Sequence, residues 1–431
     1  MKNMDMDGLK NNMNKNFIKI LKKIFLNKEN SKHSEYHWNK LINLKLTNKK
    51  NKYFKFINIE KFFNEIICYP RISSKDYIDL KNYLLNISSY KLIFINGFFC
   101  NTLSDKDFGN WKITRKFKKD IKKLPKEIKS DFFLHCSESL SEEITHIYLK
   151  KEINEIKPLY LINIGKILEN KEKIIFINNR NHIEIGNNSK CQIIEHFINN
   201  DNYKYLNNSR TTIHIKKNSF VDFIKINQNN INSYNFSNDD FFLEKNSNFS
   251  NNVINLGGYI SKQNINLRFN KPNSNVLINS LSIPIKNQIV DIKTFVEHKD
   301  KNCKSRQLHK FILSDRSKGI FHGKIKVEKN AVKTDGHMKN NNILLGEKSS
   351  IITKPQLEIY TDDVKCSHGA TTNYLDSEYL FYLRSRGISK KDAKILIICS
   401  FYLETIKNIS CSSLFNKLDK MIFSFLEKIK I

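Results

Sequence analysis

A cysteine and a histidine stand two positions apart in the stretch TDDVKCSHGAT, residues 361–371. If this stretch is a β-strand, Cys366 and His368 point to the same side, because side chains at i and i+2 share a face. A thiolate and an imidazole on one face make half of a tetrahedral metal site or half of a cluster site. Asp362 and Asp363 precede them and could supply an oxygen ligand or fix the histidine tautomer. The chain has no adjacent second half, so a site here needs ligands from another surface or another chain; a purely structural role is the alternative.

Further polar residues lie upstream of this stretch at irregular intervals. They occur in the segment VEHKDKNCKSRQLHKFI and after it: Glu297, His298, Cys303, Gln307, His309, His322 and His337. No HExxH or similar zinc-binding pattern connects them, and each alone is more typical of a strand surface than of a metal ligand. The sequence also lacks the GxSxG, GxxxxGK[ST] and GxGxxG motifs and the signatures of RRM and KH domains. These absences argue against a serine hydrolase, a P-loop ATPase, a dinucleotide enzyme and the common RNA-binding domains.

The segments that must position these residues alternate with a period of two from about residue 145 to residue 365. Short apolar runs are broken by Asn, Gly, Ser and Lys, as expected for strands and turns. The breaks resemble one another, and each ends in a small residue: Ser189, Ser219, Ser247, Ser274, Ala331 and Ser349. A strand and a corner that recur without intervening helices favour a β-solenoid over a βαβ fold. A solenoid needs caps or partners at its ends.

The regions on either side of the solenoid have helical periodicity. In the first region the apolar residues recur at helical spacing, with lysines between them: Phe17, Ile18, Leu21, Ile24 and Phe25. We therefore expect a mainly helical N-terminal region (residues 1–140), a β-helix core (residues 141–371) and a helical C-terminal domain (residues 372–431). The two helical regions could cap the solenoid, and the second could also be a docking surface.

The C-terminal domain has clear start and stop signals for its helices. Asp376 can cap a short helix that ends at Gly387, and Ser389 with Asp392 forms a capping-box pattern for the next helix. A third helix carries a regular apolar stripe: Leu414, Leu418, Ile422, Phe425 and Ile429. The sequence thus predicts a small bundle of three amphipathic helices.

Composition is typical of a globular protein, with 40% hydrophobic residues in a chain of 431. The formal net charge of +30, from 73 Lys and Arg against 43 Asp and Glu, raises the possibility of a polyanion as partner. The lysines are, however, spread along the whole chain and mixed with many asparagines and isoleucines, which favours compositional drift. Eight cysteines without a CxxC pair, no secretory signal and no membrane-length apolar run predict a soluble cytoplasmic protein.

Several long segments resemble the SufB/SufD family, the scaffold subunits of the Suf system for iron–sulfur cluster assembly. The similar segments cover VEHKDKNCKSRQLHKFILSD (residues 296–315), GIFHGKIKVEKNAVKTDGHMKNNNILLG (319–346), KPQLEIYTDDVKCSHGAT (354–371) and LFYLRSRGISKKDAKILI (380–397). The similarity continues upstream to about residue 140. The CSHGAT motif and the RQLHK segment favour the SufD branch of the family over the SufB branch. A SufB-type paralogue remains the alternative.

This resemblance implies a right-handed parallel β-helix between helical N- and C-terminal regions, and a subunit without catalytic activity of its own. It implies pairing with a SufB-like paralogue through the β-helix and with a SufC-like ATPase through the C-terminal helices. His368 would lie at the SufB interface, as a possible metal ligand shared with the partner, and Cys366 beside it. The segment implied to dock the ATPase includes Leu380, Tyr382, Arg384, Arg386 and Gly387. The expected cargo is a nascent iron–sulfur cluster held transiently by the complex, with a role in iron acquisition, and no cofactor is expected on the isolated chain.

Two alternatives from other classes remain at this point. One is a β-helix enzyme acting on polysaccharide, which would need a groove lined with carboxylates; acids are few on the expected rungs. The other is a polyanion-binding protein, motivated by the charge alone. The resemblance to the SufB/SufD family favours neither alternative. It predicts no nucleic-acid partner and no membrane insertion.

Overall fold

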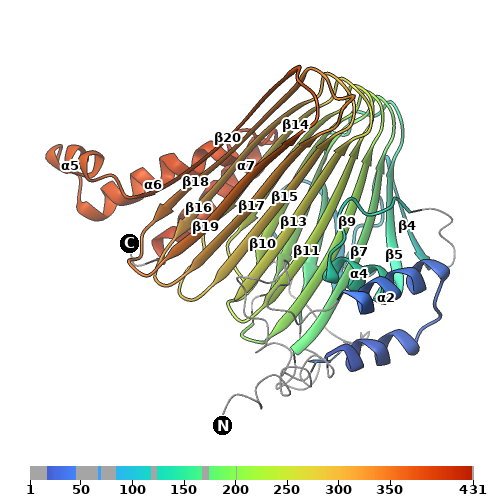
Figure 1. Ribbon diagram of the computed structural model, residues 1–431. Helices are drawn as coiled ribbons and strands as arrows, with labels where there is room; N and C mark the ends of the chain where they lie inside the picture. The colour runs from blue at the N-terminus through green and yellow to red at the C-terminus, as the bar shows by residue number, and fades with distance from the viewer. Residues whose placement is uncertain are drawn as a thin grey trace, which may run out of the picture.

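The protein forms a parallel β-helix with helices near both ends, as Figure 1 shows. The structure is a computed structural model, and it describes residues 17–44, 67–68, 84–117, 124–166, 174–199 and 201–429. Consecutive strands of the core alternate between two sheets, so that each strand pairs in parallel with the strands two places before and after it. The prediction of a mainly β fold with a parallel β-solenoid and helical ends is confirmed.

In the part of the chain that the structure describes, each sheet has ten strands, and most of them pair in parallel. Sheet A contains, in spatial order, β19 (Ser350–Ile359), β17 (Lys318–Val327), β15 (Ile289–His298), β13 (Ile260–Phe269), β11 (Tyr234–Leu243), β9 (Tyr205–Ile215), β7 (Ile174–Ile185), β5 (Glu143–Leu149) and β4 (Trp111–Phe117), with β1 (Ile67–Cys68) beside β7. Sheet B contains β20 (Val364–Tyr374), β18 (Thr334–Leu344), β16 (Lys304–Leu313), β14 (Asn275–Ser282), β12 (Asn248–Asn255), β10 (Phe220–Gln228), β8 (Lys190–Ile198), β6 (Leu159–Ile164), β2 (Tyr90–Ile95) and β3 (Phe98–Phe99). The pairs β4–β5 and β2–β3 are antiparallel.

The polar corners predicted from the sequence stack on one another. Asn188, Asn218 and Asn246 adopt positive φ angles of 55°, 58° and 57°, a conformation that asparagine tolerates better than most residues. Their side-chain amides form a ladder: Asn218 Nδ2 donates to Asn188 Oδ1 at 2.8 Å, and Asn246 Nδ2 donates to Asn218 Oδ1 at 3.0 Å. The Oγ of Ser219 accepts from the N–H of Ser189 at 3.2 Å. The asparagines at the corners therefore have a structural role, and compositional drift alone does not explain them.

One corner of the series does not have the predicted small polar residue. Asn302 has a φ of 58°, and its side chain donates to Asn273 Oδ1 at 3.1 Å, as at the other corners. The next position is Cys303, which is buried where the other corners have serine. This corner fills the double interval between Ser274 and Ala331, so the rungs are more regular than the sequence alone indicated.

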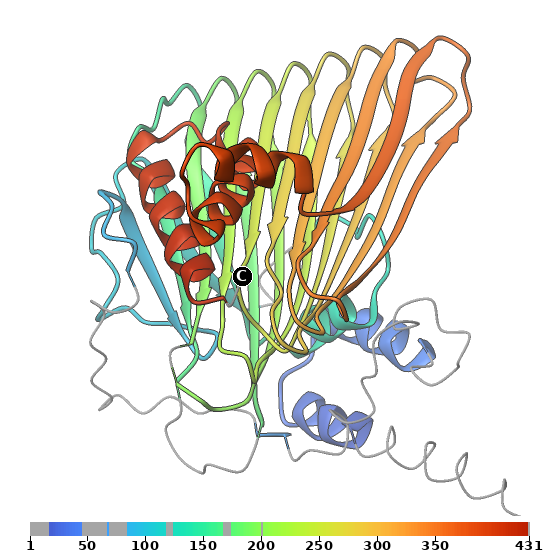
Figure 2. The same cartoon turned by 90° about the vertical axis from the view of Figure 1, so that its left-hand side faces the viewer.

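Three large apolar layers are buried among the described residues. The first lies between the two sheets and is made by inward-facing residues such as Ile147, Ile183 and Ile213. The second lies on the outer face of sheet B, which is covered by α6 (Lys390–Ile406) and α7 (Ser412–Glu427); Figure 2 shows these helices across the sheet. The third lies on sheet A beneath the helical residues 17–26, α2 (Lys32–Asn43) and α4 (Phe132–Leu140).

The predicted helix signals of the C-terminal domain are confirmed. The Asp376 side chain caps α5 (Ser377–Ser385) by accepting from the N–H of Glu378 at 2.9 Å. Gly387 follows this helix with a φ of 86°, which suits glycine because it has no Cβ. The Ser389 hydroxyl caps α6 and accepts from the N–H of Asp392 at 3.1 Å.

The N-terminal region contains strands as well as helices. β2 to β4 lie before residue 140 and extend both sheets, so the solenoid begins earlier than the expected boundary at residue 141, and β20 continues to Tyr374. Helices and strands therefore both occur in the described part of this region, and short apolar runs such as YKLIFI do not distinguish strand from helix by periodicity alone. Within the described ranges, no helix is long and apolar enough to cross a membrane.

Candidate functional site

The last rung of the solenoid is formed by β19 and β20, and it lies at the far end from β4 in Figure 2. Each strand ends its sheet, since among the described residues no strand pairs with its outer edge. The strands are 10 and 11 residues long, and most of the residues of β20 are exposed. An exposed edge of this length presents unpaired backbone N–H and C=O groups, which can pair with a strand of another chain.

Cys366 and His368 lie on β20, on the same face of the strand. The register with β18 places Cys366 beside Gly336 and His368 beside Met338. Met338 is buried in the core between the sheets, and half-buried Cys366 packs against the same core, so this face of β20 is its inner face. His368 is exposed because β20 belongs to the last rung. The two side chains therefore lie where the interior of the solenoid opens at its end.

The thiol of Cys366 is not activated in the isolated chain. Burial raises its pKa, and the Asp335 carboxylate raises it further, while a hydrogen bond from the backbone of Gly336 partly opposes these effects. Because metal and cluster ligation requires a thiolate, Cys366 needs a nearby positive charge before it becomes a good ligand. The two aspartates of the motif lie in the turn before β20, where the carbonyl of Asp363 accepts from the N–H of Lys333 at 2.6 Å.

A hydrogen-bonded chain of polar residues lies on the outer face of sheet B and joins β20 to β18 and β16. His337 Nδ1 lies 2.5 Å from the hydroxyl of Ser367, the residue between Cys366 and His368. His337 Nε2 lies 2.8 Å from Asp335 Oδ1, and Arg306 donates to both oxygens of Asp335 at 2.9 and 2.6 Å. These bonds, chiefly those from Arg306, lower the pKa of Asp335. No sequence motif linked His337 to the CSHGAT motif, although their spacing of one rung was a usable signal.

Two of the other upstream histidines, His298 and His309, are structural. His298 and His309 are buried, and their ring nitrogens lie 3.0 Å from Ser305 Oγ and 2.7 Å from Ser280 Oγ. Burial lowers the pKa of both imidazoles to about 3, so they remain neutral. Burial also raises the pKa of Cys303 to about 11. The structure thus separates these residues from Cys366 and His368.

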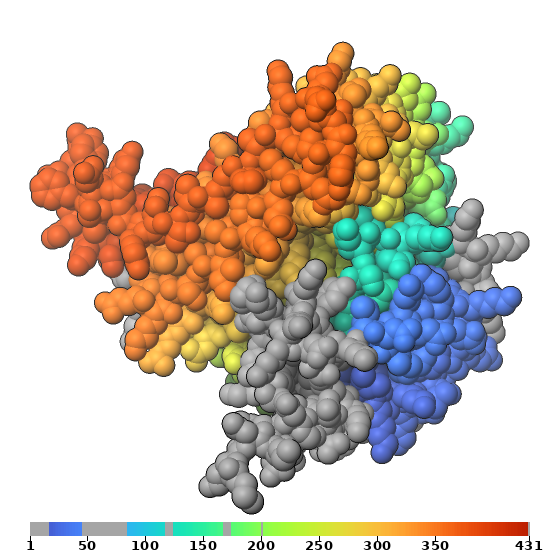
Figure 3. Space-filling model, in the orientation of Figure 1, coloured from blue at the N-terminus to red at the C-terminus, as the bar shows by residue number. Residues whose placement is uncertain are grey.

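The expected docking segment lies on α5 and the turn after it. None of the nine described residues of α5 is buried, and the Tyr382 ring is 51% exposed. The guanidinium of Arg386 lies over this ring, 4.5 Å from its centroid. Leu380 is partly exposed, and Arg384 and Gly387 are exposed. In Figure 3 this part of the chain projects from the body of the molecule.

Comparison with known families agrees with this architecture. Residues 167–401 match a family model described as "SUF system FeS cluster assembly, SufBD core domain". The chain belongs to the SufB/SufD family. The match begins within the solenoid and ends in α6, so it contains the last rung and α5.

Individual relatives align with this chain over different lengths. The iron–sulfur cluster assembly protein SufD of Escherichia coli (strain K12) is 36% identical over 377 residues, which cover 87% of this chain and 88% of the relative. An iron–sulfur cluster assembly SufBD family protein of Synechocystis is 31% identical over 218 residues, covering 51% of this chain and 48% of the relative. Protein ABCI7, chloroplastic, of Arabidopsis thaliana is 25% identical over 281 residues, covering 64% and 59%. The similarity to SufD predicted from the sequence is confirmed.

A buried group of charges lies inside the solenoid of this SufB/SufD-family chain and was not predicted. The ammonium group of Lys225 lies 2.9 Å from Glu195 and 2.7 Å from Asp239, on neighbouring strands. Burial raises the pKa of Asp239, and the nearby Glu195 carboxylate acts in the same direction. Lys225 and Glu195 are register partners in sheet B, whereas Asp239 lies in sheet A, so the ion pair between Lys225 and Asp239 joins the two sheets.

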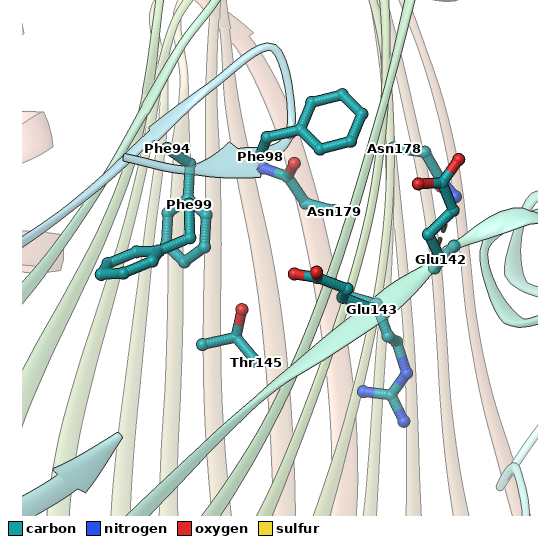
Figure 4. Close-up of a pocket in the computed structure, with 11 residues that line it drawn as sticks. Phe94, Phe98, Phe99, Glu142, Glu143, Thr145, Asn178 and Asn179 are labelled. Atoms are coloured by element: carbon teal, nitrogen blue, oxygen red, sulfur yellow. Dashed lines mark hydrogen bonds between the residues drawn. The ribbon is translucent and has the colours of Figure 1, made fainter. Parts of the chain in front are cut away.

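A pocket lies at the opposite end of the solenoid, among the first rungs (Figure 4). Its lining comes from β2, β3, β5, β7 and the residues before β5: Phe94, Gly97, Phe98, Phe99, Ser141, Glu142, Glu143, Thr145, Asn178, Asn179 and Arg180. Both of its carboxylates have cationic partners, since Arg115 donates to the two oxygens of Glu143 at 2.6 Å each and Lys28 lies 3.4 Å from Glu142. This pocket has no free charged group suited to chemistry and lies far along the solenoid from Cys366.

Proposed function

We propose that this chain is a non-catalytic scaffold subunit that acts in iron–sulfur cluster assembly by the Suf system. In this role it pairs with a SufB-like paralogue through the last rung of its β-helix and with a SufC-like ATPase through its C-terminal helices. The cluster is cargo, held transiently between subunits in the cytoplasm, and the chain helps to acquire its iron. The observation that carries the proposal is the exposed last rung with Cys366 and His368 on its inner face.

The ligand count supports a shared site. Cys366 and His368 provide at most two ligands, and a tetrahedral iron site needs four. A second solenoid that continues the sheets at β19 and β20 would cover the open interior and bring its own side chains to this pair. The positive charge of iron bound at that interface would favour the thiolate of Cys366 over the thiol, against the effect of burial.

The exposed helix α5 supports the second contact. Its aromatic residues face solvent in this chain, whereas α6 and α7 are held on sheet B by a large apolar layer. An ATPase bound at α5 would therefore pull on a domain that is attached to the solenoid. Nucleotide-driven association of two such ATPases would move the paired solenoids and open the shared site to sulfur and iron.

Cluster assembly by the intact complex tests this proposal. His368→Ala should be co-expressed with the paralogue and the ATPase, and the purified complex assayed for iron, sulfide and visible absorption. We expect the complex to form while cluster content falls at least tenfold, because an exposed histidine contributes a ligand and little stability. His337→Ala is the matched control, since it removes an imidazole from the neighbouring strand on the outer face and should leave cluster content unchanged. Normal cluster content in His368→Ala would remove this residue from the site.

A further inference from the structure

Two histidines and a glutamate converge on the outer face of sheet A, far from the last rung. His146 lies on β5, and its register partner on β7 is His182; Glu184 stands two residues further along β7. His146 Nε2 lies 3.1 Å from Glu184 Oε1, and His182 Nε2 lies 3.3 Å from the same oxygen. All three ligand atoms lie within 4.8 Å of one another. Both strands are labelled side by side in Figure 1.

We propose that His146, His182 and Glu184 form a binding site for one divalent transition-metal ion of the ferrous iron or zinc class. Two neutral imidazoles and one carboxylate are a donor set that both ions accept. Donor atoms bound at about 2.0 to 2.1 Å stand about 2.9 to 3.4 Å apart in octahedral or tetrahedral geometry. The two distances from Glu184 already lie in this range, so a small rotation of one imidazole completes the site.

The surroundings orient the ligands for a cation. His182 Nδ1 lies 2.7 Å from the hydroxyl of Thr212, which also accepts a hydrogen bond from Arg180 Nη1 at 3.0 Å. When the Thr212 oxygen also accepts a hydrogen bond from Nδ1–H of His182, the proton of the imidazole is on Nδ1 and the lone pair of Nε2 faces Glu184. This is the His182 tautomer that can bind a metal ion through Nε2. The charge of Arg180 is taken up by Glu138, whose Oε1 lies 2.9 Å from Arg180 Nε. Because Arg180 is paired with Glu138, the negative charge of Glu184 remains available to attract a cation.

Exposure indicates that the ion exchanges with solvent. The side chains of His146 and Glu184 are 20% and 32% exposed, whereas that of His182 is only 7% exposed. The site thus has one buried ligand, His182, and two partly exposed ligands, His146 and Glu184. Structural zinc sites have four protein ligands and no open position, so this geometry fits an exchangeable ion rather than a structural one.

A second group of similar composition does not fit a cation. His33, His37 and Glu138 also bring three ligand atoms within 4.8 Å. There the carboxylate is already bonded to Arg180 and, at 2.6 Å, to Arg210. Two guanidinium groups beside one carboxylate repel a metal ion, and the contrast singles out the group at Glu184.

Metal titration of the full chain tests the inference apart from the proposed cluster function. The chain should carry Cys366→Ser and His368→Ala, so that the last rung contributes no metal ligands. Co²⁺ is the first probe, because its visible absorption reports both binding and coordination number. We expect one Co²⁺ per chain in this background, and at least tenfold weaker binding after Glu184→Gln or His146→Gln.

His337→Gln is the matched control in that background, since His337 also pairs with one carboxylate but belongs to no group of three converging metal-ligand atoms among the described residues. It should bind Co²⁺ as the parent does. Competition with Zn²⁺, and anaerobic dialysis against Fe²⁺, then decides which ion the site prefers, and tight binding of either one supports the site. Failure of the parent to bind Co²⁺, or equal binding by Glu184→Gln and the parent, would overturn the inference. Glu184→Gln preserves the shape of a partly exposed side chain, so circular dichroism should confirm that it remains folded.

Discussion

Two helices of nine residues, α4 and α5, have similar apolar content and opposite environments. All nine residues of α4 are buried on sheet A, whereas none of the nine described residues of α5 is. In α4, Phe133 stacks on Phe236 of β11, with ring centroids 3.7 Å apart. In α5, Phe381 and Tyr382 face solvent. Aromatic content therefore does not decide whether a helix is buried, and an exposed aromatic helix on a folded domain indicates a surface for a partner.

The charges of the two helices differ in the same way. Glu138 of α4 is enclosed by Arg180 and Arg210 at 2.9 and 2.6 Å, and these guanidinium groups lower the pKa of its carboxyl against the effect of burial. Glu378 of α5 lies exposed in the first turn. A buried ion pair of this kind makes the placement of α4 specific, because any shift of the helix would leave a charge unpaired.

The largest expected difference concerns stability. Phe133→Ala should lower the free energy of unfolding by about 3–5 kcal/mol, because it removes a buried ring and leaves a cavity between α4 and β11. Phe381→Ala, the same substitution on α5, should change it by less than about 0.5 kcal/mol. Urea denaturation of both variants measures the contrast. Equal losses would mean that α5 is packed in solution.

An acidic medium should loosen α4 and leave α5 unchanged. His37 of α2 and His135 of α4 share a bond between their Nδ1 atoms at 2.8 Å, which two protonated rings cannot form. Burial lowers their pKa values to about 3 and about 4, below the ordinary value of 6.5. The unfolded chain therefore binds more protons than the folded chain at intermediate pH, and stability falls as pH falls below about 6.5.

At pH 5 each of these histidines should cost about 2 kcal/mol relative to pH 7.5. Hydrogen–deuterium exchange, corrected for the intrinsic rate at each pH, should show lost protection in α2 and α4 and no change in α5, which contains no histidine. Unchanged protection of α4 at pH 5 would show that the pair tolerates protonation.

The smallest expected free-energy change is in partner binding at α5. Tyr382→Ala should raise the Kd for the SufC-like ATPase at least tenfold, about 1.4 kcal/mol, without loss of stability. Tyr36→Ala on α2 is the control, because this tyrosine is 50% exposed and Tyr382 is 51% exposed. Titration calorimetry with the purified ATPase measures both. If the two variants bind equally well, the docking surface lies elsewhere.

Point variants of α5 are preferable to truncation at Gly387. Such a truncation would also remove α6 and α7, which cover apolar residues of sheet B such as Ile224 and Ile254. Lost binding would then report an exposed core rather than a lost contact.

Much of the solenoid could be predicted because its signals are local. The period of two identified the strands, and the corners at Ser189, Ser219, Ser247 and Ser274 identified the rungs. The same face for Cys366 and His368 followed from their spacing. β2 to β4 were missed because short apolar runs outside the repeat carry no register information, and the corner at Cys303 because cysteine replaces the usual small polar residue.

The groups that bring distant residues together could not be predicted in the same way. His146 and His182 are 36 positions apart, outside the regular spacing of the rungs, because a longer connection separates β5 from β7. Glu138 meets Arg210 across 72 positions, from a helix laid on the sheet. Such contacts depend on how a helix or a long loop returns to the solenoid.

The sequence by itself determined the strand pattern, the corners, the caps of the last helices and the pairing of a thiol with an imidazole on one face. Each of these depends on residues a few positions apart, whose geometry is set by the backbone. Only the tertiary structure decided which rung remains open, which helix is buried and which imidazoles meet a carboxylate. Those outcomes are collective, because burial and charge pairing depend on every segment that packs against a given side chain.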